Sequence, residues 1–146
     1  MARFVFNLEG VLRHRKLHER QKQRVLAERQ AMVVHLTREL REMDQQVQTA
    51  TARLRESKLL GRLDLAFITA HRRYTLAMQR RAIDQARRIA LAQQAVEQAR
   101  TELVAAARER KVIEKLRERR YQQWQAEQQR KESAQLDEIG MQLSRP

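Results

Sequence analysis

The chain has 146 residues, of which 34 % are charged and 4 % aromatic, and its formal net charge is +13. It contains 3 glycines, 1 proline and no cysteine. These numbers exclude disulfides, thiolate metal sites and cysteine nucleophiles, and they argue against a globular fold with many turns. The length fits one domain, and the composition is typical of long helices.

A first helix is expected over about residues 8–60, because nothing in this stretch breaks a helix. Asn7 is a candidate N-cap, and Glu9 then lies in the first turn, where the helix dipole favours a negative charge. The second half of this helix carries an apolar residue at every third or fourth position. These residues are Val33, Leu36, Leu40, Met43, Val47, Ala50 and Leu54. This spacing is a heptad seam.

A turn is expected at about residues 61–64, because Gly61 can adopt the left-handed conformation that closes helices. Asp64 is the expected N-cap of a second helix over about residues 64–139, with Gly140 as its stop and a tail over 140–146. This helix also carries a heptad seam. Its positions are Ile89, Ala92, Val96, Ala99, Leu103, Ala106, Arg110 and Ile113.

A heptad seam is too narrow to bury itself and needs a partner helix. The nearest partner is the other half of the same chain, so the sequence predicts an all-α fold: a single antiparallel coiled-coil hairpin over residues 1–146. At 1.5 Å per residue the helices are roughly 80 and 110 Å long. The second therefore overhangs the first at the terminal end. The alternative is a parallel homodimer with a kink at Gly61.

The terminal end of the expected hairpin, which we call the base, is rich in charge. Continued backwards, the first seam would place polar side chains at core positions. Its members there are Arg29, Leu26, Lys22, Glu19, Arg15 and Leu12. Since burying an unpaired charge costs several kcal/mol, the base is either solvated and loosely paired or covered by another protein, and we favour the second interpretation.

Basic residues of both helices gather at this base. The candidates for binding a partner are Arg13, Arg15, Lys16, Arg20, Arg117, Arg119 and Arg120. Acidic residues lie among them and few aromatic residues are near, which argues against specific recognition of nucleic acid. An acidic protein surface is the expected partner.

Two aromatic groups are further candidates. Tyr121 and Trp124 share a face of the overhanging helix and either anchor a partner or pack on Leu8 and Phe6. After the turn, Phe67, Tyr74 and Met78 recur at helical spacing. These three belong either to the core near the turn or to an exposed patch that docks a partner. The sequence leaves both alternatives open.

No catalytic or cofactor-binding constellation stands out. His14 and His18 are four residues apart, a spacing that can chelate a metal, but no third ligand is evident. We therefore expect no enzyme activity, no metal and no cofactor. No stretch has the apolar length of a membrane span or the pattern of a signal peptide, so we expect a cytoplasmic protein.

The chain resembles the flagellar FliJ family along most of its length. The opening, from Phe4 to Arg15, matches the family pattern F-x-F-x-L-x-x-V-L-x-x-R. The segment from Arg110 to Leu116, Arg-Lys-Val-Ile-Glu-Lys-Leu, is similar to the late R-K-x-hydrophobic-E-K-L segment. Glu132 with Leu136-Asp137-Glu138 is similar to the terminal E-x-x-x-L-D-E.

The resemblance implies an antiparallel helical hairpin similar to the central stalk of rotary ATP synthases. It implies a non-enzymatic part of the flagellar type III export apparatus whose terminal end inserts into the hexameric export ATPase and promotes its assembly. It also implies contacts with a membrane export-gate protein, for which Tyr74 and Met78 are the candidates. An ATPase regulator and export chaperones are further expected partners. The location would be cytoplasmic, at the inner membrane of the flagellar base, with membrane association only through partners.

Two other functions stay open on the sequence. One is the equivalent stalk of a virulence injectisome, although the F-x-F-x-L opening favours the flagellar member. The other is a basic coiled-coil scaffold that binds nucleic acid or anionic membrane.

Overall fold

The computed structural model describes residues 3–59 and 64–143, of which residues 58 and 59 are described by their backbone alone. It contains two helices, α1 over Glu9–Leu59 and α2 over Leu65–Leu143. The described residues form no strand, so the all-α prediction is confirmed. The turn expected at Gly61 lies outside the described residues. Neither helix has an apolar stretch long enough to span a membrane within the described parts.

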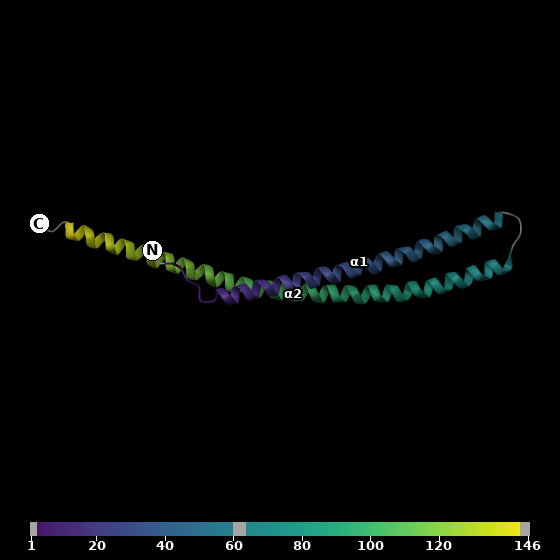
Figure 1. Ribbon diagram of the computed structural model, residues 1–146, viewed down its shortest axis with the longest axis horizontal. Helices are drawn as coiled ribbons and strands as arrows, with labels where there is room; N and C mark the ends of the chain where they lie inside the picture. The colour runs from purple at the N-terminus through teal and green to yellow at the C-terminus, as the bar shows by residue number, and fades with distance from the viewer. Residues whose placement is uncertain (1–2, 60–63, 144–146) are drawn as a thin grey trace. The chain divides into compact units, whose positions relative to one another are not determined.

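The chain divides into two compact units, and each contains a segment of both helices (Figure 1). Unit 1 comprises residues 1–22 and 103–146, and unit 2 comprises residues 23–102. In unit 1, Glu9 pairs with Arg117 and Glu19 pairs with Arg110. Residue numbers thus increase along α1 in the direction in which they decrease along α2. The helices are therefore antiparallel, as predicted for a hairpin.

The predicted seams are the contact surfaces of the helices. Every seam residue from Val33 to Leu54 and from Ile89 to Ile113 is buried or half-buried. The buried apolar side chains are Leu12, Ala106 and Phe6 in unit 1, and Met78, Ala99 and Val96 in unit 2. Two of these are alanines, whose small side chains let two helices approach closely.

One buried polar residue in unit 2 has no counterpart in the sequence prediction. Gln85 is 3 % exposed. Its Nε2 donates hydrogen bonds across the helix pair to the Leu36 carbonyl, at 3.0 Å, and to Glu39 Oε2, at 2.8 Å. Because both amide hydrogens are used, burying the NH₂ group leaves no donor unpaired.

The start of α2 confirms the predicted N-cap. Asp64 Oδ1 accepts hydrogen bonds from the backbone N–H of Ala66 at 3.0 Å and of Phe67 at 3.3 Å. The Asp64 carbonyl accepts from Ile68 N at 3.1 Å. The side chain thus satisfies two donors that a helix start leaves free.

Two helix ends differ from the prediction. The first bond of α1 runs from Leu12 N to the Leu8 carbonyl, which puts Leu8, not Asn7, at the N-cap. α2 continues through Gly140 to Leu143, so the predicted stop at Gly140 is wrong. Gly140 does not take the left-handed conformation, and a helical glycine costs only about 1 kcal/mol relative to alanine.

Replacing Asp64 by Ala is expected to loosen the first turn of α2, because two backbone donors lose their acceptor. A lost cap costs about 1 kcal/mol, so hydrogen exchange at Ala66 and Phe67 should speed up about fivefold. Asp64→Asn is the control, since Asn caps as well as Asp. Equal exchange rates in wild type and Asp64→Ala would show that the cap does not hold this end.

Candidate partner-binding surfaces

Ion pairs cross between the two helices throughout unit 1. Arg110 of α2 binds Glu19 of α1 and also Glu114, one turn further along its own helix. Three more pairs flank this group. They are Arg15–Glu109, Lys16–Glu114 at 3.8 Å and Arg117–Glu9 at 3.1 Å.

These pairs explain how charged residues occupy the seam of unit 1. Arg15 and Glu19 are half-buried, as the seam register predicts, whereas Arg29 in unit 2 is exposed. The pKa of Arg110 is raised, mainly by its hydrogen bond to Glu19. Burial lowers this pKa, and the charge of Glu114 raises it further. Arg110 is charged at neutral pH, as arginines are in general, and these contacts favour the charged form further. Pairs nearer the surface, such as Arg15–Glu109, contribute little, because water screens them.

The seven basic candidates fall into two groups. Arg15, Lys16 and Arg117 belong to the cross-helix pairs above, and the Arg120 guanidinium lies 5.8 Å from the centre of the Phe6 ring. The remaining three, Arg13, Arg20 and Arg119, are exposed and contact no carboxylate among the described residues. Only this second group is free to bind a partner without disturbing unit 1.

Aromatic side chains form a cluster where the N-terminal segment crosses α2. The Phe4 ring lies 5.3 Å from Tyr121, edge to face, and 5.9 Å from Trp124, and the rings of Tyr121 and Trp124 stack at 5.9 Å. Of the two sequence alternatives for Trp124, the structure shows packing on the N-terminal segment, although Phe4 takes the place expected for Leu8 and Phe6. Tyr121 keeps 42 % of its surface exposed.

Beyond this cluster, no helix of the described part of unit 1 lies beside α2. Every described side chain from Gln129 to Leu143 is exposed, whereas α1 already begins opposite Arg117. The predicted overhang of the longer second helix is therefore present. Its apolar residues Leu136, Ile139 and Leu143 are 69 %, 54 % and 82 % exposed.

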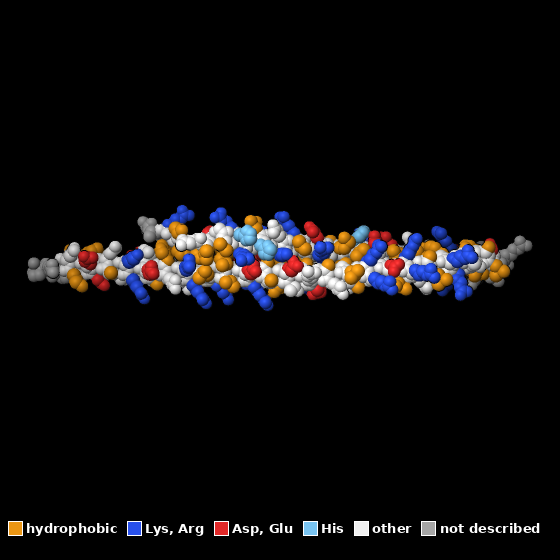
Figure 2. Space-filling view, turned by 90° about the horizontal axis from the view of Figure 1, so that it is seen from below, with side chains coloured by type: hydrophobic (Ala, Val, Ile, Leu, Met, Phe, Trp, Pro, Cys, Tyr) orange, Lys and Arg blue, Asp and Glu red, His pale blue; other side chains and the backbone are white. Residues whose placement is uncertain are grey.

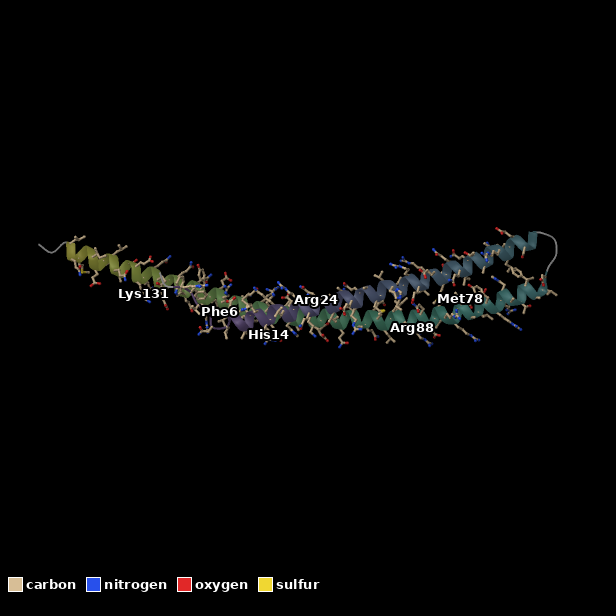
Figure 3. All side chains as sticks on the ribbon, viewed as in Figure 1. Phe6, His14, Arg24, Met78, Arg88 and Lys131 are labelled. Atoms are coloured by element: carbon tan, nitrogen blue, oxygen red, sulfur yellow. The ribbon has the colours of Figure 1, made fainter. Side chains whose placement is uncertain are left out.

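In unit 2, the three residues that follow the turn at helical spacing, Phe67, Tyr74 and Met78, divide between surface and core. Met78 is 4 % exposed and lies between the helices (Figure 3). Phe67 and Tyr74 are 43 % and 38 % exposed. Both line a groove of about 770 Å³ between the helices. Its lining includes Glu42, Thr49 and Arg53 of α1 and His71 of α2. Tyr74 is thus accessible to a partner, and Met78 supports the helix packing behind it.

The imidazoles of His14 and His18 gain no third ligand. Among the described residues no three histidine or acidic side chains converge as a metal site would require.

Replacing Phe4 by Ala should uncover Trp124, the chain's only tryptophan. The emission of Trp124 should then shift to longer wavelength. The ring interactions that this substitution removes are worth about 0.5–1.5 kcal/mol beyond their burial, so unit 1 should also unfold at lower urea concentration. Phe67→Ala, which changes a phenylalanine of unit 2, should leave the spectrum unaltered. An unshifted spectrum in Phe4→Ala would show that Phe4 does not cover Trp124.

Comparison with known proteins assigns the chain to a family. The family model described as "Flagellar FliJ protein" matches residues 4–145, which is nearly the whole chain. Comparison with curated proteins and with solved structures gives no match. The match includes the N-terminal segment that packs on α2, both helices and the overhang. The chain therefore belongs to the FliJ family of flagellar proteins, which relates it to flagellar type III export.

Proposed function

We propose that this protein is a non-enzymatic stalk of the flagellar type III export apparatus. Unit 1 inserts into the ring of the hexameric export ATPase, promotes assembly and activity of the ring, and links it to the membrane export gate. The protein then works in the cytoplasm at the flagellar base. Export chaperones and an ATPase regulator are further proposed partners.

The observation that carries this proposal is the set of unpaired cations on unit 1 of a FliJ-family chain. Arg13 and Arg20 are seven residues apart and so share one face of α1. Arg119 adds an exposed cation on α2. Since Arg15, Lys16 and Arg117 are held in cross-helix pairs, the three unpaired members of the candidate set are the ones that we expect an acidic surface inside a ring to meet.

Coupling between ring and stalk requires unequal contacts with different subunits. A ligand shifts an equilibrium only by its differential affinity for the two states. Free cations on two different helices present unequal charge around unit 1. As the nucleotide state of each subunit changes, the orientation of unit 1 with the lowest free energy changes with it.

Contact with the export gate is assigned to the groove of unit 2 that Tyr74 lines. An aromatic ring at the edge of a groove is a typical anchor of a protein interface. Because Met78 is buried, its part in this contact is to support the groove from the core.

The first test measures the ATPase rate of the same organism's export ATPase with and without this protein. The wild type should stimulate hydrolysis and favour the hexamer. The triple variant Arg13→Glu, Arg20→Glu and Arg119→Glu should bind about tenfold more weakly or worse, because three favourable charge contacts become repulsive.

The matched control reverses three exposed arginines of unit 2: Arg29→Glu, Arg38→Glu and Arg41→Glu. It has the same net charge and should stimulate as the wild type does. Absence of stimulation by the wild type would contradict the stalk function. Equal loss in both variants would show that net charge, and not the surface of unit 1, determines binding.

The second test concerns the gate contact. Tyr74→Ala should weaken binding to the cytoplasmic domain of the export-gate protein by about tenfold, in the range of a single aromatic anchor. Stimulation of the ATPase should not change. Leu76→Ala, which removes an exposed side chain outside the groove lining, is the control in a pull-down. Undiminished binding by Tyr74→Ala would exclude this groove as the gate contact.

A further inference from the structure

A row of exposed arginine pairs follows α2 through unit 2. The pairs are Arg72–Arg73, Arg80–Arg81 and Arg87–Arg88, and all six residues are exposed. They recur every seven or eight residues, or about 11 Å along the axis, so they return to the same side of the helix. Figure 2 shows basic and hydrophobic side chains gathered next to each other on this part of the molecule.

This side of α2 is turned away from α1. The residues that face α1, among them Met78 and Gln85, are 4 % and 3 % exposed. At 100° per residue, Arg73, Arg80 and Arg87 lie on the opposite side of the helix. Arg72, Arg81 and Arg88 lie nearer the flanks of the helix, and all three are exposed. The arginines therefore take no part in the packing of unit 2.

The charge of this face is nearly uncompensated. Between Leu65 and Val96, α2 carries six arginines and a single acid, Asp84. Asp84 Oδ1 lies 3.7 Å from Arg87 NH1. Among the described residues no carboxylate lies within ion-pair distance of the other five arginines.

Large apolar side chains lie among these arginines. Leu76, Ile83 and Leu91 are 49 %, 56 % and 66 % exposed. Leu76 and Ile83 are seven residues apart and follow the same line along the helix as the arginine pairs. The outer face of α2 thus combines exposed aliphatic residues with a dense positive charge, a combination that favours an anionic interface with an apolar layer beneath it.

We propose that this outer face, from Arg72 to Leu91, binds directly to the surface of an anionic lipid bilayer, with α2 parallel to the membrane. The arginines contact the lipid phosphates, and Leu76, Ile83 and Leu91 enter the boundary between headgroups and acyl chains. This contact is separate from membrane association through the export gate and does not depend on the proposed stalk function.

Two other anionic partners fit the face less well. A nucleic acid would meet the arginines but would leave the aliphatic residues without an apolar partner, and no aromatic residue lies on this face for base stacking. An acidic partner helix would cover a narrow seam. The arginines, however, extend over about half of the helix circumference, from Arg72 to Arg81. A planar surface meets such a broad face more completely.

The test is co-sedimentation of the full-length protein with vesicles of phosphatidylcholine alone and with vesicles containing 30 % phosphatidylglycerol. The wild type should bind only the anionic vesicles. Arg73→Glu, Arg80→Glu and Arg87→Glu together should lower the partition coefficient by about 100-fold, because one basic residue near such a surface is worth about fivefold. Leu76→Gln, Ile83→Gln and Leu91→Gln together should lower it by about tenfold or more.

The control is again the variant Arg29→Glu, Arg38→Glu and Arg41→Glu on α1. Its net charge equals that of the variant changed at Arg73, Arg80 and Arg87, and it should bind the vesicles as the wild type does. Circular dichroism should show unchanged helix content, since every substituted side chain is exposed. If the variant with Glu at positions 73, 80 and 87 loses helix content, the variant with Gln at these three positions is used in its place.

Three results would overturn the proposal. The first is equal binding of the wild type to both kinds of vesicle. The second is an equal loss of vesicle binding in the control variant, which would show that net charge alone determines the binding. The third is full vesicle binding by the Leu76, Ile83 and Leu91 variant together with competition by single-stranded DNA, which would indicate a general polyanion-binding face.

Discussion

A heptad seam has a contact face only one or two residues wide, and each helix of this protein therefore depends on the other for burial. The seam residues from Val33 to Leu54 reach at best half burial, and few side chains are enclosed completely. Apolar packing alone gives such a pair of helices little means of fixing its register. Polar contacts across the seam supply it: the amide of Gln85 in unit 2 and the guanidinium of Arg110 in unit 1.

Local and one-dimensional features of the sequence were sufficient to predict the class of fold, the hairpin and the cap at Asp64. The spacing of apolar residues predicts the class of fold, and the single break between two long helical stretches predicts that they run antiparallel. The cap follows from the preference of an Asp side chain for the backbone N–H groups that begin a helix. The charged positions of the seam, Arg15 and Glu19, were also predicted from register.

The individual partners could not be predicted, because they depend on which residues of the second helix lie opposite. The burial of Gln85 has a signal in its own helix, because the second seam continued backwards from Ile89 reaches Gln85. The partners of Gln85 on α1 and the pairing of Arg110 with Glu19 have no such signal. Core and exposed patch both stayed open for Met78, because the prediction did not continue the second seam backwards beyond Ile89, where the same spacing reaches Met78. The stop at Gly140 failed for a different reason. Glycine permits a left-handed end, but nothing in the exposed final turns requires one.

The end of unit 1 also has a consequence for the width of the molecule. A single helix with its side chains is about 10–12 Å across, and two helices packed 8–10 Å apart are about 20 Å across. Over residues 129–143 no described helix lies beside α2, and the aromatic cluster at Phe4 and Trp124 marks the change. An opening whose diameter lies between these two widths would admit the single helix but not the helix pair. Entry would therefore stop at the cluster. In the proposed insertion of unit 1 into the ATPase ring, shape would thus limit the depth before any charge makes contact.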